Sequence, residues 1–227
     1  MFKSLEVIRV QKEYIVIGMG RFGSSVAAAL FKEGNEVLAI DKNEENIENN
    51  QDCITHGVIG DATDLQTLKE AGIRNFDTVI VAIGDDIQAS ILSVLLLKEL
   101  GVKNVVAKAI NKSHGKVLNK VGADRVIFPE RDMGERVAHQ LMSSPNVLNF
   151  IELADEYSIE EIKAPASMYG KNLREINLRA NYNITVIATK NNNKIEILPN
   201  PEQALKSEDI LIVIGENEDL QNFSQMK

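Results

Sequence analysis

The chain has 227 residues, of which 44% are hydrophobic and 26% charged, and its formal net charge is −8. These values are typical of one or two globular domains, and the acidic balance argues against a nucleic-acid partner and against nonspecific binding to an anionic membrane. Cys53 is the only cysteine, which excludes an internal disulfide and fits a reducing compartment. Because the longest largely apolar segment, residues 91–97, is far shorter than the ~20 residues that span a bilayer, we expect a cytoplasmic protein with no membrane span. Residues 1–13 are expected to form an N-terminal extension.

The first informative motif lies between residues 14 and 30. Residues 14–17 predict a buried strand, and Gly18, Gly20 and Gly23 follow it at the spacing G-x-G-x-x-G before an alanine-rich helix. In a dinucleotide fold the first glycine permits a tight turn, the second lets the backbone approach a phosphate, and the third lets helix and strand pack closely. The N–H groups and the positive dipole end of such a helix face the bound phosphates.

A second strand, expected over residues 36–40, ends at the acidic residue Asp41. Asp41 lies 21 residues beyond Gly20, where this fingerprint places the acid that holds the ribose hydroxyls. A carboxylate there also repels a 2′-phosphate, which disfavours NADP. The order of strand, glycine turn, helix, strand and acid therefore predicts a nucleotide site.

Strands and helices continue to alternate as far as residue 128. We expect further strands at residues 53–59, 78–83, 104–109 and 125–128, and helices at residues 64–71, 86–100 and 113–121. Six strands that alternate with helices predict an α/β fold, a Rossmann-like doubly wound parallel sheet.

A crossover helix and a second domain are expected next. Pro129 ends the sheet, and residues 132–144 predict an amphipathic helix with an inward apolar face. The inward residues of this helix are Met133, Val137, Leu141 and Met142. We therefore divide the chain into a nucleotide-binding domain over residues 14–145 and a C-terminal domain over residues 146–227.

The C-terminal domain has a pattern of short strands. These are expected at residues 157–164, 183–190, 194–198 and 209–215, with a loop and short helix at residues 167–178 and a closing helix at residues 218–223. Two of the strands flank the turn at residues 191–193 and form a hairpin. We expect a small α+β domain.

The sequence offers no convincing set of catalytic residues. A dehydrogenase needs an acid–base group beside its substrate, and only His56, His114 and His139 are available, none with an obvious partner. We find no metal-ligand cluster, no Ser-His-Asp order and no Walker loop. We therefore expect a protein that is not an enzyme, and the alternative is an NAD-dependent oxidoreductase or an NAD(H)-sensing module.

Four further polar residues are expected at the edge of the sheet that carries the glycine turn. Arg21 can reach a terminal phosphate, which suits ADP or ATP better than a dinucleotide, or it can face solvent. Asp61 can bind the adenine amino group or a ribose, or it can cap the next helix. Lys108 can add charge for phosphates, and Glu130 can complement the dipole of the crossover helix or ligate a cation.

Beyond these single residues, the chain resembles the RCK family, whose members combine TrkA-N and TrkA-C domains. The resemblance to TrkA-N rests on Asp41 and on residues 18–23, 60–63, 75–84, 88–90 and 122–124, and that to TrkA-C on residues 155–159 and 177–182. Over residues 14–223 the chain is similar to the KtrA-type and KtrC-type regulatory subunits of bacterial potassium channels, so the small α+β domain is expected to be an RCK-C domain.

This resemblance implies a regulatory role. Such subunits form homodimers that assemble into a homo-octameric ring, and the ring gates an integral membrane potassium-translocating subunit at the inner face of the membrane in response to ATP or ADP. The implied nucleotide-site residues are Gly18, Gly20, Arg21, Phe22, Gly23, Asp41, Lys42, Asp61, Ala62, Thr63, Ile83, Gly84, Lys108 and Glu130. Arg21 is implied to sense the γ-phosphate, Asp41 to hold the ribose, and Glu130 to bind a divalent cation or sodium between subunits.

The resemblance also implies a second ligand, cyclic di-AMP, which inhibits the channel from the C-terminal domain. The residues implied for this site are Leu173, Leu178, Arg179, Thr185 and Pro201. Arg179 is the implied phosphate ligand, and the alternative for its side chain is an ion pair with Glu175 on the same short helix.

Overall fold

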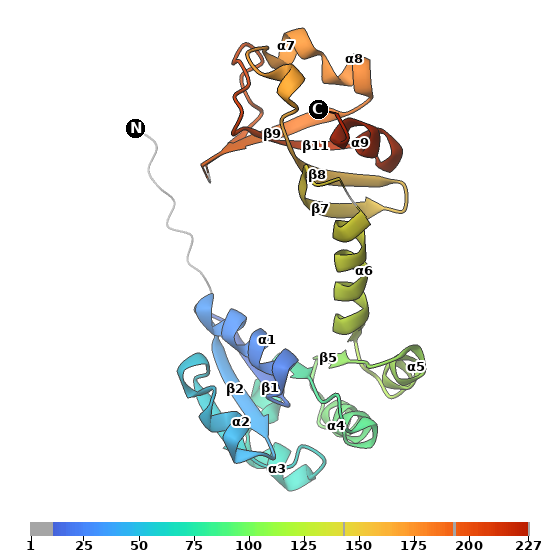
Figure 1. Cartoon of the computed structure of the whole chain (residues 1–227). Coiled ribbons are helices and arrows are strands. Elements are labelled where there is room, and N and C mark those ends of the chain that lie inside the picture. The colour runs from blue at the N-terminus through green and yellow to red at the C-terminus, as the bar shows by residue number, and fades with distance from the viewer. Residues whose placement is uncertain (1–10, 143, 193, 227) are drawn as a thin grey trace. The chain divides into compact units, whose positions relative to one another are not determined.

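The computed structural model describes residues 11–142, 144–192 and 194–226, without the side chains of His139 and Gln140 (Figure 1). Most of the expected N-terminal extension, residues 1–10, therefore lies outside the described residues. The chain divides into two compact units, of which the first ends at Asp132 and the second begins at Met133.

A six-stranded parallel sheet forms the centre of the first unit, in the order β3-β2-β1-β4-β5-β6. Its strands are β1 Glu13–Ile17, β2 Glu36–Asp41, β3 His56–Ile59, β4 Thr78–Val81, β5 Asn104–Lys108 and β6 Arg125–Ile127. Successive residues of one strand belong to different core clusters, with Ile15 and Ile17 in one and Val16 in the other. Both faces of the sheet are therefore covered, and the doubly wound Rossmann-like prediction is confirmed.

The helices of the first unit are α1 Arg21–Lys32, α2 Glu44–Glu48, α3 Leu65–Glu70, α4 Ile87–Glu99 and α5 Lys112–Lys120, with short 3₁₀ turns at Gln51–Cys53 and Ile73–Asn75. Asn43, Asp64, Asp86 and Asn111 cap four of these helices with side-chain oxygens that accept from backbone N–H groups. The sequence did not predict α2. The third strand begins at His56 rather than at residue 53, because the chain first makes a 3₁₀ turn.

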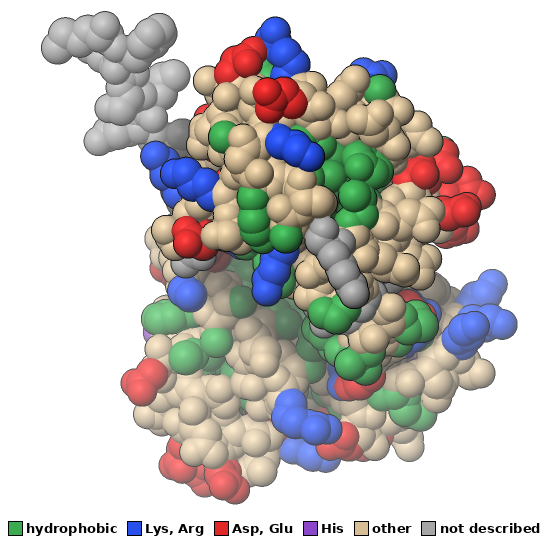
Figure 2. All heavy atoms as spheres, turned by 45° about the horizontal axis from the view of Figure 1, so that its top comes forward, with side chains coloured by type: hydrophobic (Ala, Val, Ile, Leu, Met, Phe, Trp, Pro, Cys, Tyr) green, Lys and Arg blue, Asp and Glu red, His purple; other side chains and the backbone are tan. Residues whose placement is uncertain are grey.

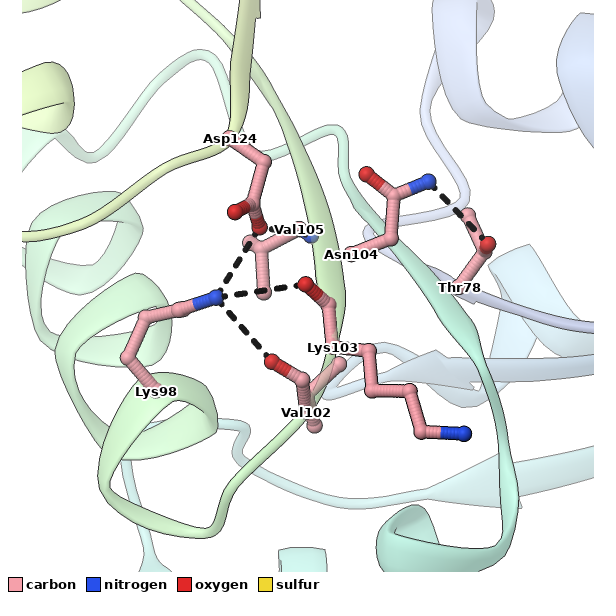
Figure 3. Close-up of polar contacts among 7 residues, drawn as sticks. All are labelled: Thr78, Lys98, Val102, Lys103, Asn104, Val105 and Asp124. Atoms are coloured by element: carbon pink, nitrogen blue, oxygen red, sulfur yellow. Dashed lines mark hydrogen bonds and ion pairs between the residues drawn. The ribbon is translucent and has the colours of Figure 1, made fainter.

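One polar cluster fixes the end of α4 against the start of β5 (Figure 3). The Lys98 ammonium donates to the carbonyl oxygens of Val102 and Lys103, at 3.0 and 3.4 Å, and pairs with Asp124 at 3.0 Å. Asp124 also accepts from the N–H of Val105 at 2.6 Å. Partial burial alone would raise the pKa of Asp124, but the hydrogen bonds from Val105 and Lys98 outweigh it and lower that pKa.

The second unit is built on a five-stranded antiparallel sheet in the order β10-β9-β11-β8-β7. The chain enters it through α6 Pro129–Met142, and its other elements are β7 Val147–Ala154, β8 Tyr157–Lys163, a 3₁₀ turn Ala166–Met168, α7 Leu173–Ile176, α8 Leu178–Tyr182, β9 Thr185–Asn191, β10 Lys194–Ile197, β11 Ile210–Glu216 and α9 Asn217–Ser224. The predicted small α+β architecture is confirmed. Strand β7 was missed, because two register shifts interrupt the regular alternation of its residues.

The apolar core of the second unit lies on one face of this sheet. Ile162, Leu211 and Val213 are buried there with Leu220 and Phe223 of α9. On the same face, Glu160 is only 5% exposed, and burial raises its pKa. The structure thus places an acidic group where an apolar residue is usual.

The opposite face of the five-stranded sheet carries an unusual number of isoleucines. Ile151, Ile159, Ile210, Ile212 and Ile214 alternate with the core residues of their strands, and none of them belongs to a core cluster of the described residues. Lys190 and Glu161 form an ion pair across this face at 3.2 Å. We call these five residues the isoleucine face.

The expected orientation of the crossover helix is wrong. Met133, Val137, Leu141 and Met142 were predicted to face inward, but they are 54%, 44%, 82% and 76% exposed. Hydrophobic side chains are visible at the surface among charged ones (Figure 2). The helix starts at Pro129 rather than at residue 132, since proline fits the first helical position, where its missing N–H costs nothing.

None of the described helices is both long and apolar enough to cross a membrane.

Candidate nucleotide site

The turn between β1 and α1 has the backbone geometry that its glycines predict. Gly18 has φ of +90°, a conformation that favours glycine, and its N–H donates to the carbonyl of Ile40 at 2.8 Å. A Cβ atom on Gly23 would lie 1.9 Å from the Gly18 carbonyl oxygen, so only glycine permits this approach of helix to turn. Beside Gly20, in contrast, a Cβ would meet no atom within 4 Å. The turn therefore has no room for a side chain at Gly23, where it packs against the protein, but has free space beside Gly20.

The N-terminus of α1 is free to receive an anion. Gly20 occupies the N-cap position, no side chain caps the helix, and its first turn contains no acidic residue. The first N–H groups of the helix therefore lack side-chain acceptors, and the positive end of the helix dipole is not neutralised locally. A phosphate group has the charge and the acceptor oxygens that this position lacks.

Asp41 holds the glycine turn from the end of β2. Its Oδ2 atom accepts from the N–H of Met19 at 2.6 Å and from the side-chain amide of Asn46 at 3.1 Å, and Oδ1 accepts from the N–H of Asn43 at 2.8 Å. The residue is only 9% exposed. The carboxylate is thus at the predicted position beside the turn, with several of its acceptor sites filled by the protein.

Asp61 lies in the turn that follows β3. The N–H and the hydroxyl of Thr63 both donate to its Oδ1 atom, at 2.8 and 2.7 Å, and these hydrogen bonds, together with the nearby Lys42 charge, lower the pKa of Asp61. Asp64, rather than Asp61, caps α3. The capping alternative for Asp61 is therefore wrong.

A second charged group lies at the ends of β5 and β6. The Lys108 ammonium pairs with Glu130 at 2.6 Å and lies 5.8 Å from the centre of the Phe22 ring. A Cβ on Gly84 would lie 3.1 Å from the same ammonium. The hydrogen bond from Lys108 and the positive charge of Arg21 help to lower the pKa of Glu130. Residues of β5, of α6 and of the loop after β4 therefore meet beside the start of α1.

The structure thus brings together most residues of the implied nucleotide set. Ile83 lies against Gly18, Gly84 against Lys108, and Ala62 is buried, with its carbonyl accepting from Ser93. Sequence reasoning missed the hydrogen bonds from Asn46 and from the backbone of Met19 to Asp41, because Asn46 lies outside the glycine fingerprint and the fingerprint assigns no role to the N–H of Met19. The ligand contacts of all these residues are still predictions.

A pocket of about 280 Å³, which the sequence did not predict, adjoins Glu130. It is lined by Ala109, Ile110, Asn111, Lys112, Phe128, Glu130 and Arg131. The sequence could have predicted this pocket, because its lining residues directly follow two neighbouring parallel strands, where ligands of such sheets bind. In the described part of the chain, no group of three or more His, Cys, Asp or Glu residues is arranged to hold a metal ion.

The two histidines with described side chains do not form an acid–base pair. His56 is exposed at the start of β3. His114 is 3% exposed, burial lowers its pKa, and its Nε2 atom has no hydrogen-bond partner among the described residues. The side chain of His139 lies outside the described residues.

In the second unit, the five residues implied for cyclic di-AMP come from α7, α8, β9 and the loop after β10. The N–H of Arg174, next to Leu173, donates to the carbonyl of Pro201 at 3.1 Å, so these two segments are adjacent. Arg179 is exposed, and within residues 144–192 and 194–226 no ion pair joins it to Glu175. Glu175 instead completes a capping box with Asn172. The ion-pair alternative for Arg179 is therefore wrong.

Comparisons with known proteins agree with this architecture. The TrkA-N domain family matches residues 14–129, and the TrkA-C domain family matches residues 158–226. Ktr system potassium uptake protein C of Bacillus subtilis is 47% identical over 95% of this chain and 97% of its own length. Ktr system potassium uptake protein A of the same organism is 47% identical over 93% of this chain and 95% of its own length.

Solved structures show the same fold. The GsuK RCK domain matches 96% of this chain with a TM-score of 0.64 at 16% identity, and GsuK bound to ADP matches 58% with a TM-score of 0.50 at 29% identity. This chain spans 48% and 34% of the length of those two chains.

The domain architecture and the identity to full-length relatives define the class: the chain belongs to the RCK family of proteins with TrkA-N and TrkA-C domains. Within that family it is similar to the Ktr system potassium uptake proteins A and C.

Proposed function

We propose that this chain is a regulatory subunit of a potassium uptake system and that it binds ATP or ADP at the start of α1. The observation that carries the proposal is the uncapped N-terminus of α1, closed on the protein side by Gly18 and Gly23 and open at Gly20. The names of the two Bacillus subtilis relatives support the role in potassium uptake.

Adenine nucleotides with a free terminal phosphate fit the charges of this site. Arg21 and Lys108 supply positive charge beside the helix N-terminus, while a dinucleotide has no terminal phosphate to engage them. GsuK, in its structure bound to ADP, is a related protein that holds such a nucleotide. In this proposal no bond is broken: the chain is a sensor and not an enzyme.

The ion pair between Lys108 and Glu130 offers a way for the nucleotide to act on α6. A terminal phosphate competes with Glu130 for the Lys108 ammonium, and Glu130 lies in the first turn of α6. ATP and ADP differ in the charge that they place there, so they stabilise different states of this helix. A divalent cation or sodium that binds Glu130 once Lys108 is withdrawn belongs to the same proposal.

Exposed apolar surfaces support assembly of the chain into a homodimer and a homo-octameric ring. The α6 residues Met133, Val137, Leu141 and Met142 are 44–82% exposed, and no residue of the isoleucine face belongs to a core cluster of the described residues. The proposed assembly binds a membrane-embedded potassium-translocating subunit, which places the ring at the inner face of the membrane.

The exposed Arg179 supports cyclic di-AMP as a second ligand of the second unit. The guanidinium of Arg179 makes no ion pair with Glu175, whose side chain completes the capping box with Asn172, so it is available to a phosphate. The adjacent segments at Leu173 and Pro201 provide apolar contacts for a base. This site would let a dinucleotide second messenger act independently of ATP.

Calorimetric titration of the purified chain with ATP, ADP and NADH tests the nucleotide proposal. We expect ATP and ADP to bind at least about tenfold more tightly than NADH. Gly20→Ala should abolish ATP binding without lowering the melting temperature, because its Cβ meets no protein atom but occupies the phosphate space. The matched control is Gly134→Ala in α6, which has no neighbour within 4 Å either.

Preferential binding of NADH would overturn the ATP/ADP assignment and favour the NAD(H)-sensing alternative. The regulatory role is tested separately by rubidium flux into vesicles that contain a potassium-translocating membrane subunit, with and without this chain and ATP. Flux that is unaffected by the chain would contradict that role.

A further inference from the structure

The last helix of the chain, α9, runs along strand β8. Its first residue, Asn217, donates its N–H to the carbonyl of Glu156 at 2.9 Å, directly before β8 begins. At its other end, the carbonyl of Ser224 accepts from the side-chain amide of Asn146 at 2.9 Å. The carbonyl of Asn146 in turn accepts from the N–H of Lys163, the last residue of β8. The helix therefore follows β8 from one end to the other.

Glu160 is the middle residue of β8 and lies on the face that α9 covers. Ser158 and Ile162 share this face, because alternate residues of a strand point to the same side. Ile162 belongs to one buried apolar cluster with Leu220 and Phe223 of α9. The Oε2 atom of Glu160 and the hydroxyl of Ser158 are buried and have no hydrogen-bond partner among the described residues. Two polar groups are thus enclosed under the helix without compensation.

Among the described residues, no cation faces Glu160 from β7, β11 or α9, the elements that pack against β8. Its cross-strand neighbours are apolar, Phe150 on β7 and Val213 on β11. The charged residues of these three elements are all acidic: Glu152, Glu216, Glu218 and Asp219. The titratable residues of β8 that alternate onto the opposite face are Tyr157, Glu161 and Lys163. Burial raises the pKa of Glu160, and an ionised carboxylate there would have no partner.

We propose that α9 detaches from β8 when Glu160 loses its proton to solvent, and that this detachment releases residues 144–146. Detachment hydrates the carboxylate while β8 keeps its pairings with β7 and β11, so a local opening is enough. At low pH the burial of Leu220 and Phe223 keeps the helix in place. The inference is independent of nucleotide binding, because all of these residues belong to the second unit.

The end of α9 holds the connection between α6 and β7. The carbonyl of Ser224 accepts from the hydroxyl of Ser144 at 2.8 Å as well as from Asn146. When α9 leaves, Ser144 and Asn146 lose their shared acceptor. The N–H of Val147, which donates to the Ser144 carbonyl at 2.8 Å, and that of Lys163 then report on this segment. Proton concentration would thereby act on the segment through which α6 enters the sheet.

Hydrogen exchange of the full chain, followed by mass spectrometry between about pH 5 and pH 8, tests this proposal. Exchange rates are compared with the intrinsic rate at each pH, so that the protection factors report on opening alone. Glu160→Gln keeps the shape of the side chain but cannot ionise. Glu152→Gln is the matched control, because Glu152 lies opposite Ser158 on β7 and is exposed. Melting temperatures at about pH 5 report on the folding of each variant.

In the wild-type chain we expect the protection of α9 to fall about tenfold per pH unit, because the open state releases one proton. The fall ends where Glu160 also ionises in the closed state. Peptides that contain Val147 and Lys163 should lose protection with the same slope. Glu160→Gln should remove the slope, and Glu152→Gln should keep it.

A second variant separates the role of the proton from that of the hydrogen bonds. Asn146→Ala removes one of the two bonds to the Ser224 carbonyl. It should lower the protection of α9 by about fivefold at every pH and leave the slope unchanged. A merely structural role for Glu160 would have the same signature, an equal change at every pH.

Three results would overturn the inference. The first is protection of α9 that does not depend on pH in the wild-type chain, and the second is a slope that persists in Glu160→Gln. The third is an equal slope in β9, β10 and β11, since the whole sheet and not α9 would then open. A slope in α9 with constant protection at Val147 and Lys163 would overturn the release of residues 144–146.

Discussion

Gly23→Ala is expected to damage nucleotide binding by moving the start of α1. The new Cβ would lie 1.9 Å from the Gly18 carbonyl oxygen and 3.0 Å from its carbon. Because real Cβ atoms keep at least 3.0 Å from such neighbours, the helix must retreat by about 1.1 Å from the turn. Backbone atoms on both sides of the contact leave no flexible side chain to absorb the change.

The magnitude follows from the geometry of hydrogen bonds. An N–H donor placed about 2.9 Å from a phosphate oxygen is no longer bonded when it lies about 1 Å further away. Loss of one bond to a charged group costs about 1.5–3 kcal/mol, so the dissociation constant for ATP should rise about 10- to 150-fold. Overpacking should also lower the free energy of unfolding by about 1–3 kcal/mol.

Calorimetric titration with ATP and thermal unfolding of the same samples measure both effects. Gly20→Ala and Gly134→Ala serve as controls, because a Cβ at either position meets no atom within 4 Å. We expect Gly23→Ala to lose affinity and stability, Gly20→Ala to lose affinity alone, and Gly134→Ala to lose neither. Wild-type affinity and melting temperature in Gly23→Ala would refute the reasoning about close approach.

Three further changes test other parts of the chain. Lys98→Met keeps the aliphatic stem but removes the three bonds of the ammonium, and urea unfolding should show a loss of about 1–2 kcal/mol. Burial raises the pKa of Glu160 above its ordinary value of 4.5. The folded unit therefore retains the proton of Glu160 to higher pH than the unfolded chain does, and its free energy of unfolding falls as pH rises. Glu160→Gln should remove this fall in thermal unfolding experiments between about pH 5 and pH 8. Arg179→Ala should weaken binding of cyclic di-AMP about tenfold by calorimetry, without affecting ATP.

Each of these changes has a control. Lys103 pairs with Asp77 where both side chains are about four-fifths exposed, so Lys103→Met should have almost no effect on unfolding. Glu152→Gln, at an exposed position of β7, should leave the pH dependence unchanged. Arg174→Ala removes an exposed partner of Glu202 and should not alter cyclic di-AMP binding. Equal effects of test and control in any pair would contradict the corresponding argument.

The fold of the first unit could be predicted because its signals are local. Glycine spacing reports on backbone conformation, so the φ of Gly18 and the close approach at Gly23 follow from the sequence. The bonds from Met19 and Asn46 to Asp41 could not be predicted in the same way. They depend on how α2 packs against β2 and β3, and a helix of five residues leaves almost no periodic signal.

The second unit was harder to predict because its signals are interrupted. Strand β7 contains two register shifts, so its apolar residues do not alternate cleanly. Glu160, about which no prediction was made, is buried on the core face of its strand. Both features arise where pairing between strands, rather than the local sequence, decides which side a residue faces.

The exposed apolar residues of α6 show a different limit of prediction from the sequence. Periodicity identifies the apolar side of a helix, as it did for Met133, Val137, Leu141 and Met142, but it cannot tell whether the same chain covers that side. Water-exposed apolar side chains at 44–82% exposure add little to the stability of a single chain. Their regular placement on one helix face is therefore not explained by the folding of this chain, and in the proposed assembly these side chains would be buried against another subunit. The first turn of α6 contains Glu130, which pairs with Lys108. A phosphate bound at Lys108 would therefore act on the same helix that, in the proposed assembly, contacts a neighbouring subunit. In the proposed function, assembly and nucleotide sensing thus involve the same helix.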